Sequence, residues 1–257
     1  MGIIERLNLQ GKTALVTGGG QGLGRIFCHA LAEAGANVCV ADIRLKNAKI
    51  VAEEISANCK VETLPMYVDV TNEASVDTMF KEVENAFRFL DICVANAGVF
   101  IPGIAHEMPL ADWKKTFAVD VEGVFLTARG AARLMIPRKK GSIITISSMN
   151  GHVAAYSPSC SYCAAKSAVL NFTRAVAREW GPYNIRVNSI SPGSMHTEML
   201  DHDCKGNEFF EIWTQRTALG RLGNPEELQS ALIYLASDAS SFTTGSDVIV
   251  DGGHTCI

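Results

Sequence analysis

The architecture of this 257-residue chain follows from residues 13–24, which read TALVTGGGQGLG. The apolar run Thr13–Thr17 predicts a buried strand, and an apolar helical pattern follows the glycines as far as Gly35. Glycines at such a turn let the backbone approach a pyrophosphate, and the free N–H groups of the following helix favour an anion. The stretch therefore predicts a dinucleotide site that contains Gly18, Gln21, Gly22, Leu23 and Gly24.

The same alternation of strand and helix continues along the chain. Apolar runs predict further strands at 37–41, 61–68, 91–95, 142–147, 185–190 and 247–250. Helical spacing and capping residues predict helices at 71–87, 110–135, 159–180 and 225–235. Such alternation makes a parallel sheet with helices on both faces. We expect an α/β fold in which residues 1–257 form a single doubly wound dinucleotide-binding and catalytic domain of about seven strands.

The strand at 37–41 ends in Asp42, a position that bears on the choice of cofactor. A carboxylate there hydrogen-bonds both hydroxyls of an adenosine ribose and repels a 2′-phosphate. We therefore expect NAD(H), with NADP(H) as the alternative. Arg44 keeps that alternative open, although Gln21 offers no second cation for a phosphate.

Tyr162 and Lys166 stand four residues apart in the predicted helix 159–180 and therefore share one face. An ammonium a few ångströms from a phenol in a dry cleft lowers the pKa of a phenol from about 10 toward neutrality, which makes it a usable acid and base. Ser148 follows the predicted strand 142–147, and the carboxyl ends of such strands are where open α/β sheets bind ligands. These three side chains are candidate catalytic residues.

Charge and length exclude several classes of protein. The net charge is −4, and the only basic cluster, Arg138-Lys139-Lys140, is expected to cap a helix. We expect no nucleic-acid or membrane partner, because no basic footprint and no membrane-spanning apolar run is present. Neither end of the sequence carries a targeting signal, so we expect a soluble cytoplasmic protein.

Eight cysteines in a chain of this size do not indicate a small disulfide-bonded scaffold. Cys28, Cys39, Cys59 and Cys93 stand in apolar patterns typical of buried, reduced thiols. Cys160 and Cys163 flank Tyr162 as a C-x-x-C motif, but no second pair completes a zinc site. We therefore expect no metal.

Along nearly its whole length the chain resembles the short-chain dehydrogenase/reductase family. The matching segments are Thr17-Gly18-x-x-x-Gly22-x-Gly24, Asp69-Val70, Asn96-Ala97-Gly98, Ser148, Tyr162-x-x-x-Lys166, Asn188, Pro192-Gly193 with Thr197, and Asp251-Gly252-Gly253. The resemblance implies that Tyr162 is the general acid and base, that Lys166 holds the nicotinamide ribose, and that Ser148 orients the substrate oxygen. It implies a homotetramer as well.

The resemblance also assigns the rest of the cofactor site. Asp69 and Val70 would meet the adenine, and Asn96, Ala97 and Gly98 would line the adenosine ribose. The region after the strand at 185–190 would complete the site near the phosphates and carboxamide, through Pro192, Gly193, Met195 and Thr197.

Asp120 departs from the family pattern. In Val119-Asp120-Val121-Glu122-Gly123-Val124-Phe125, the aspartate stands where the family usually has its fourth catalytic residue, an asparagine. Either the branch tolerates the exchange or the proton relay is altered. Asp120 is therefore a candidate catalytic residue.

The substrate is indicated by polar groups near the predicted site. Residues 194–217 mix polar and aromatic side chains, as expected for a substrate lid. Asn150, Trp213 and the neighbouring His152 and Glu107 suggest a hydroxyl-rich ligand, since each buried hydroxyl needs a partner. The pattern is similar to the polyol dehydrogenases and ketose reductases of the family. Reductases of bulkier ketones or of 3-oxoacyl compounds are alternatives within the enzyme class.

A protein that senses a nucleotide or acts as a scaffold is the alternative outside the enzyme class. Such a binder has no use for Ser148, Tyr162 and Lys166 together, which favours an oxidoreductase.

Overall fold

The computed structural model describes residues 2–197 and 207–256. Seven parallel strands form one sheet in the order β3-β2-β1-β4-β5-β6-β7. The sheet consists of β1 (Thr13–Thr17), β2 (Asn37–Asp42), β3 (Thr63–Tyr67), β4 (Ile92–Ala95), β5 (Gly141–Ile146), β6 (Ile185–Pro192) and β7 (Asp247–Val250). The predicted doubly wound α/β fold is confirmed.

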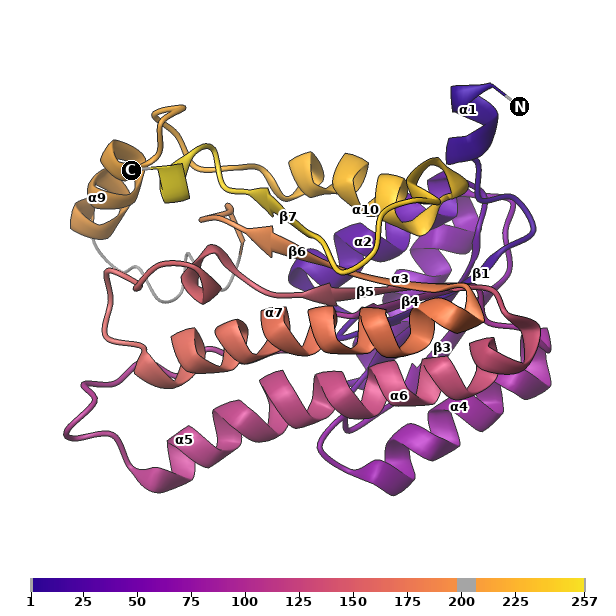
Figure 1. Cartoon of the computed structure of the whole chain (residues 1–257), viewed down its shortest axis with the longest axis horizontal. Coiled ribbons are helices and arrows are strands. Elements are labelled where there is room, and N and C mark those ends of the chain that lie inside the picture. The colour runs from indigo at the N-terminus through magenta and orange to yellow at the C-terminus, as the bar shows by residue number, and fades with distance from the viewer. Residues whose placement is uncertain (1, 198–206, 257) are drawn as a thin grey trace.

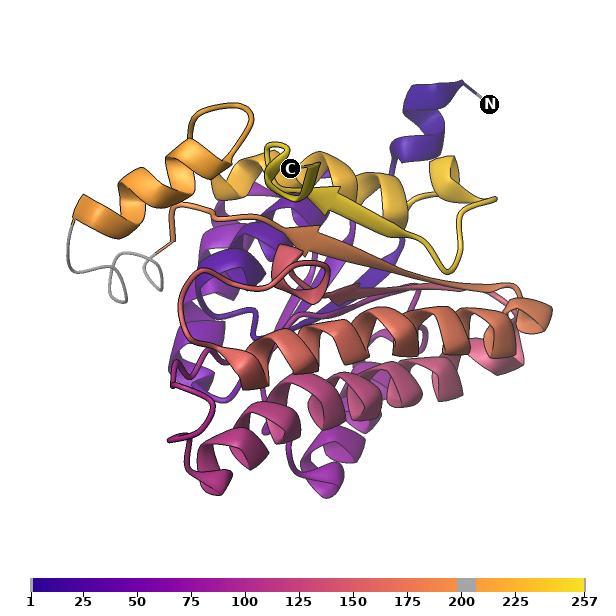
Figure 2. The ribbon, with the colours of Figure 1, turned by 60° about the vertical axis from the view of Figure 1, so that its left-hand side comes forward.

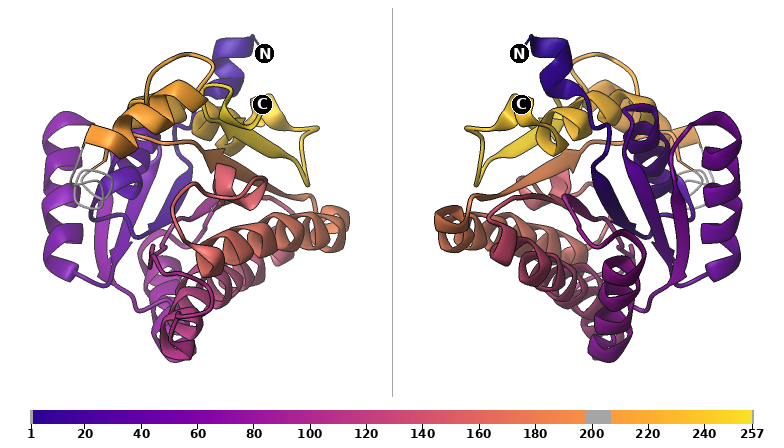
Figure 3. Two further views of the ribbon diagram at one scale, coloured as in Figure 1. Left: turned by 90° about the vertical axis from the view of Figure 1, so that its left-hand side faces the viewer. Right: turned by 90° about the vertical axis from the view of Figure 1, so that its right-hand side faces the viewer.

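Helices cover both faces of this sheet, which makes three layers (Figures 1 and 3). The described helices are α1 (Ile3–Leu7), α2 (Gly22–Glu33), α3 (Leu45–Asn58), α4 (Glu73–Phe87), α5 (Leu110–Phe117), α6 (Gly123–Met135), α7 (Cys160–Trp180), α9 (Asn207–Arg216) and α10 (Gln229–Ala236). Side chains of α2, α3 and α10 build one large buried cluster, those of α4, α6 and α7 build a second, and Ala95, Val124 and Val169 form a third, small one.

The alternation of side chains along β1 explains why both faces are apolar. Ala14 and Val16 belong to the cluster under α2, whereas Leu15 belongs to the cluster under α4 and α6. All three are fully buried, as expected for a central strand with helices on both faces. A continuous apolar run is therefore the correct signature for this strand, although it lacks the polar alternation of a half-exposed one.

The strand order reverses between β1 and β4, which lie side by side in the sheet. Open α/β sheets bind ligands at the carboxyl ends of strands beside such a reversal. The glycine-rich turn after β1, the start of α7 and helix α9 lie at this edge of the sheet (Figure 2).

Several predicted boundaries needed correction. The predicted helix 110–135 is divided into α5, a π-helical turn at Ala118–Glu122, and α6. The predicted strand 61–68 is shorter, as β3, and the strand 185–190 extends to Pro192. The basic triplet 138–140 ends the helix as expected: Lys139 is the C-cap of the 3-10 turn Ile136–Arg138 that continues α6, and the backbone N–H of Lys140 donates to the Met135 carbonyl. The Arg138 side chain donates to the Leu90 carbonyl and pairs with Asp91.

The predicted lid at 194–217 lies partly outside the described residues, since 198–206 are not among them. The described part includes helix α9 and the isolated bridge between Met195 and Gly223. Within the described ranges, no helix combines the length and the apolar character that a membrane span requires.

Candidate active site

Tyr162 and Lys166 lie one turn apart near the start of α7. The Lys166 Nζ is 5.4 Å from the centre of the Tyr162 ring, and the Phe100 ring packs edge-on against that ring at 5.2 Å. Ser159 occupies the N-cap position, as predicted, but its hydroxyl donates to the Ser157 carbonyl and does not cap the helix. The helix therefore brings the predicted phenol and ammonium together.

The ammonium of Lys166 is buried but has two partners. Its Nζ donates to the carbonyl of Ile146 at 3.1 Å and lies 3.2 Å from Oδ2 of Asp120. Burial by itself lowers the pKa of Lys166, but the Asp120 carboxylate, with a contribution from Tyr162, outweighs burial and raises it. Lys166 therefore remains a cation even though its side chain is only 4% exposed.

Asp120 is the centre of the π-helical turn between α5 and α6, and it is completely buried. Its Oδ1 accepts a hydrogen bond from the backbone N–H of Val99 at 2.8 Å, and its Oδ2 faces Lys166. A Cβ atom on Gly98 would lie 3.4 Å from the Lys166 Nζ and 3.5 Å from Asp120 Oδ2. The segment after β4 thus borders the Asp120–Lys166 pair.

Ser148 follows β5 and precedes the short 3-10 turn Met149–Gly151. Its Oγ accepts a hydrogen bond from the backbone N–H of Asn150, and the side chain is largely buried. The neighbouring Ser147 Oγ donates to the Lys166 carbonyl at 2.9 Å. That bond ties the end of β5 to α7, so the segment that carries Ser148 is held against the Tyr162–Lys166 turn.

The glycine-rich turn has the shape expected of a phosphate-binding turn. Gly18 has a positive φ of 65°, and a Cβ atom on Gly24 would lie only 2.0 Å from the Gly18 carbonyl oxygen. The Asn96 side chain donates to the carbonyls of both Thr17 and Gly18. Asn96 therefore fixes the turn from the neighbouring strand β4, while Ala97 lies against Gly18.

The other predicted residues of the turn lie at the start of α2. Gln21 occupies the N-cap position with an exposed side chain, and Gly22 is exposed with a φ of 51°. Leu23 is half-buried against the apolar cluster of α2, α3 and α10. Exposed residues at the N-terminus of the helix leave this end of α2 open to a ligand.

Asp42 ends β2 and is only 5% exposed. Its Oδ2 accepts from the backbone N–H of Gly20, and its Oδ1 accepts from the backbone N–H of Arg44. The carboxylate therefore lies directly beneath the glycine turn, where the sequence predicts the adenosine ribose. The Arg44 residue is exposed.

Asp69 and Val70 follow β3 at the same edge of the sheet. Asp69 Oδ1 accepts two hydrogen bonds from Thr71, one from its backbone and one from its hydroxyl. Val70 is buried and leaves no room for a side chain on Gly123, because a Cβ there would lie 2.8 Å from Val70. The Asp69 carboxylate thus stabilises the turn that follows β3 by accepting these two hydrogen bonds.

The segment after β6 contains the last predicted cofactor residues. Pro192 ends the strand, and Gly193 approaches the backbone of Asp251 so closely that a Cβ would lie 2.6 Å from it. Met195 is buried, and Thr197 is half-buried at the edge of the described residues. This segment is held at the sheet edge by its neighbours.

The predicted substrate residues lie in three different elements. Asn150 is half-buried in the turn after Ser148, and Trp213 is half-buried on α9. His152 points toward β7, where its Nε2 lies 2.7 Å from Asp247 Oδ2. Glu107 is exposed and pairs with the neighbouring His106 at 3.6 Å.

Two neighbours of the site were not identified from the sequence. Phe100 contacts the Tyr162 ring, and Ser147 binds the main chain of α7. Their positions in the segments that follow β4 and β5 are the available signal, because the carboxyl ends of these strands border the predicted site.

The thiols mostly behave as the sequence suggests. Cys28, Cys39 and Cys93 are buried, and burial raises the pKa of Cys93 to about 12. Cys59, which was predicted to be buried, is half-buried at the end of α3. The described residues contain no group of three or more His, Cys, Asp or Glu side chains suited to a metal ion.

Comparison with known proteins identifies the family. Residues 18–255 match the family described as Enoyl-(Acyl carrier protein) reductase. A sorbose reductase of Schizosaccharomyces pombe is 39% identical to this chain, over 96% of this chain and 97% of that protein. A Yarrowia lipolytica protein named "Probable NADP-dependent mannitol dehydrogenase" is 38% identical, over 99% of this chain and 91% of that protein.

Solved structures agree with the sequence comparison. A short-chain type dehydrogenase/reductase from Mycobacterium marinum is 40% identical, covers 100% of both chains, and superposes with a TM-score of 0.96. Similarity of this extent embraces the sheet, the glycine turn and the Tyr162–Lys166 helix together. The chain belongs to the short-chain dehydrogenase/reductase family, and it is an oxidoreductase that acts on CH–OH groups with a nicotinamide cofactor.

Proposed function

We propose that the protein interconverts a polyol and its ketose, with NAD(H) as the preferred cofactor. The observation that carries this proposal is the assembly of Tyr162, Lys166 and Asp120 beside Ser148 at the carboxyl edge of the sheet. Relatives named for sorbose and mannitol, which match nearly the whole chain, support a hydroxyl-rich substrate.

Proton transfer is assigned to Tyr162. In the oxidation of a secondary alcohol, ionised Tyr162 takes the hydroxyl proton as the C–H bond breaks and the carbonyl forms. A nicotinamide cofactor bound at this site would supply the hydride chemistry in either direction. Ser148 donates a hydrogen bond to the substrate oxygen, which fixes that oxygen next to the phenol.

Lys166 has two tasks in this scheme. Its positive charge stabilises the phenolate form of Tyr162, and its ammonium is placed to hold the nicotinamide ribose. Asp120 and the Ile146 carbonyl keep the ammonium charged and in position, although the site is buried. Asp120 is therefore a positioning residue that acts through Lys166.

The cofactor residues fit a dinucleotide. The turn at Gly18 and Gly24 would hold the pyrophosphate, since its backbone is open to a close approach. Asp42 would accept hydrogen bonds from the adenosine ribose and repel a 2′-phosphate, which supports NAD(H). Because one relative is named NADP-dependent and Arg44 is exposed nearby, NADP(H) is the competing outcome.

The remaining site residues complete the proposal. Asp69 and Val70 would border the adenine, Asn96, Ala97 and Gly98 the ribose, and the segment after β6 the nicotinamide. Asn150 would contact the substrate from the turn after Ser148, and Trp213 would contact it from helix α9, which is part of the predicted lid at 194–217. That lid would exclude water from the reacting atoms during turnover.

The test is to follow NADH and NADPH absorbance while polyols and ketoses, including sorbose and mannitol, are screened as substrates. A bulky cyclic ketone and a 3-oxoacyl thioester serve as competitors. Turnover of a polyol or ketose at the highest kcat/KM, abolished in Tyr162→Phe, supports the proposal. Preference for either competitor refutes the polyol assignment, and NADH binding without any turnover indicates a nucleotide-binding scaffold.

A further inference from the structure

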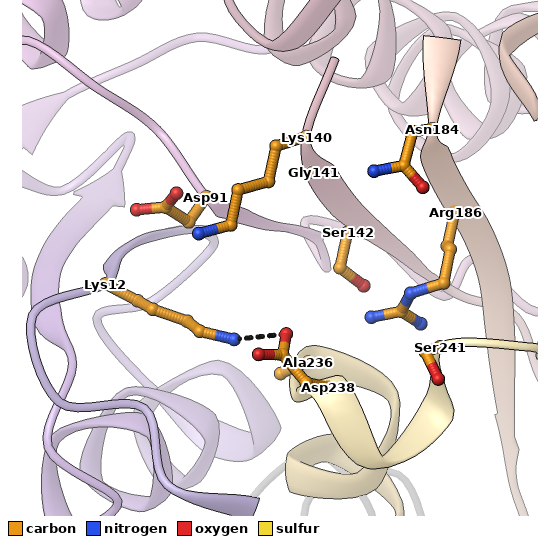
Figure 4. A pocket seen from close by; sticks show the side chains of 10 residues that line it. All are labelled: Lys12, Asp91, Lys140, Gly141, Ser142, Asn184, Arg186, Ala236, Asp238 and Ser241. Atoms are coloured by element: carbon orange, nitrogen blue, oxygen red, sulfur yellow. Dashed lines mark hydrogen bonds and ion pairs between the residues drawn. The ribbon is translucent and has the colours of Figure 1, made fainter. Parts of the chain in front are cut away.

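A cavity of about 200 Å³ lies at the opposite edge of the sheet from the catalytic residues. It is formed where β1, β4, β5 and β6 begin, together with the end of α10 (Figure 4). Its charged side chains are Lys12, Lys140, Arg186, Asp91 and Asp238. The cofactor and substrate residues described above all lie near the carboxyl ends of the strands, so none of them lines this cavity.

The charges around the cavity do not cancel in pairs. Lys12 forms an ion pair with Asp238 at 2.8 Å, and Asp91 forms one with Arg138 at 3.1 Å. Lys140 has no carboxylate of the described residues within 4.0 Å of its ammonium, and the same holds for the guanidinium of Arg186. Two cations therefore face the cavity without a direct counter-ion.

Arg186 is held in place by neutral groups. Its guanidinium donates to the Ser240 hydroxyl at 2.7 Å and to the carbonyls of Leu235 and Ser237 at 2.9 and 3.1 Å. Burial lowers the pKa of Arg186, against the opposite influence of Asp238 and Tyr234. Neutral acceptors orient a guanidinium but leave its charge in place, so a nearby anion would be favoured.

A second hollow of about 450 Å³ adjoins the cavity. Lys12, Asp91 and Lys140 line both, and the second hollow adds one cation, Arg138, and one carboxylate, Glu62, to its wall. Figure 4 shows Lys12, Lys140 and Arg186 entering from separate parts of the chain. A ligand bound between these cations would therefore have room to extend beyond its anionic group.

We propose that this cavity binds the phosphoryl group of a small molecule, either inorganic phosphate or a phosphate monoester. Lys12, Lys140 and Arg186 supply donors from three directions, which suits a tetrahedral oxyanion better than a planar carboxylate. Asp238 lowers the affinity of the cavity for an anion, because its carboxylate repels the same anion. The site is separate from the cofactor site and does not depend on the proposed substrate.

The competing explanation is purely structural. Arg186 binds the last carbonyls of α10, and cations stabilise the C-terminal end of a helix without any ligand. Lys140 is the informative residue, because it is exposed and forms no described ion pair that stabilises the fold. Its neighbour Lys139 carries the same charge but lines neither hollow, which makes it a matched control.

The experiment is titration calorimetry of inorganic phosphate into the protein saturated with nicotinamide cofactor, at fixed pH and ionic strength. Saturation blocks the glycine turn as a competing phosphate site. We expect saturable binding that Lys140→Gln weakens about tenfold, as for the loss of one charge-assisted contact. Lys139→Gln should leave the affinity for phosphate within about twofold, because the Lys139 charge lies outside the cavity and salt screens it.

Asp238→Asn provides a test in the opposite direction. It removes the repelling carboxylate and frees Lys12, so phosphate should bind several-fold more tightly. The Asp238 side chain is 61% exposed, so loss of its ion pair should cost little stability. Unchanged or weaker binding in Asp238→Asn would overturn the proposal, as would equal losses in the Lys139 and Lys140 variants.

Glycerol 3-phosphate distinguishes the two sources of the phosphoryl group. Tighter binding than inorganic phosphate supports a monoester whose organic part enters the second hollow, and equal or weaker binding supports free phosphate. If neither compound shows saturable binding to the cofactor-loaded wild type, the cluster is structural and the proposal is wrong.

Discussion

Replacing Asp120 with asparagine removes one buried negative charge from the site while keeping nearly the same side-chain shape. Asp120 Oδ2 lies 3.2 Å from Lys166 Nζ, which lies 5.4 Å from the centre of the Tyr162 ring. The carboxylate is therefore within about 9 Å of the ring centre, where two unit charges interact by about 1.8 kcal/mol at an effective dielectric constant of about 20. That energy corresponds to about 1.3 pH units.

The sign follows from the charges. Ionising the phenol next to a carboxylate brings two negative charges together, so removing the carboxylate favours the phenolate. Asp120 also raises the pKa of Lys166, and its loss lowers that pKa. As long as Lys166 stays protonated, the rising limb of kcat for alcohol oxidation, which reports the loss of the Tyr162 proton, should move about one unit to lower pH in Asp120→Asn.

The assay is the pH profile of kcat for polyol oxidation with NAD⁺, in wild type and in two variants. Glu122→Gln is the matched control, because Glu122 belongs to the same π-helical turn but is exposed. Solvent screens its charge, so the limb of the pH profile should stay in place in this variant. A limb that stays put in Asp120→Asn would show that Asp120 does not act on the proton relay. A limb that moves to higher pH would show that the loss of Lys166 charge dominates, and the sign would be wrong.

The apparent pKa read from this limb belongs to the coupled group of Asp120, Lys166 and Tyr162 and to no single residue.

A structural role of Asp120 is tested separately with Asp120→Leu. That change leaves the Lys166 ammonium and the Val99 N–H without their carboxylate partner. Removing one member of a buried ion pair typically costs about 3–5 kcal/mol, so Asp120→Leu should lose both stability and activity, whereas Asp120→Asn should remain active.

Four further outcomes are expected. Tyr162→Phe should keep the melting temperature and the NADH affinity but lose essentially all turnover; residual activity within about tenfold of wild type would contradict the role of the phenol. Asp42 should favour NAD(H) over NADP(H) by about 2–3 kcal/mol, or roughly 30- to 160-fold in kcat/KM, and equal efficiencies would refute the carboxylate's role. Gly24→Ala should lower NADH affinity more than tenfold in a fluorescence titration, because its Cβ would lie 2.0 Å from the Gly18 carbonyl oxygen, whereas Gly181→Ala, with no atom within 4 Å of the added Cβ, should not. Light scattering should give a homotetramer, since α6 and α7 carry apolar side chains beyond those that face the sheet; a monomer would contradict it.

The sequence was sufficient for features that depend on local pattern. Strand β1 is a continuous apolar run, and the glycines that follow are required by a positive φ and by close backbone contacts. The spacing of Tyr162 and Lys166 fixes their relation on one helix face. The family resemblance and the fold were predicted correctly for these reasons, and the comparisons confirm both.

Other features required the folded chain. Nothing local indicates that Lys166 bonds the Ile146 carbonyl, because these residues are brought together by the packing of α7 on β5. The π-helical turn around Asp120 has the same apolar spacing as the helix that was expected there. The helix cap at 138–140 was predicted from the local sequence, but the cavity that Lys140 shares with Lys12 and Arg186 was not, because those two residues are distant in the sequence. The site assignments and the lid stay predictions until they are tested.

The π-helical turn limits which insertions and deletions the chain can accept. Each residue of a regular helix turns the chain by about 100°, so deleting one residue from Ala118–Glu122 would rotate α5 against α6 by about that angle. Both helices would keep their composition, but Asp120 would leave Lys166 and its bond to Val99. Substitutions at exposed positions of this turn, such as Glu122, should therefore be tolerated. Insertions and deletions at the same positions should not.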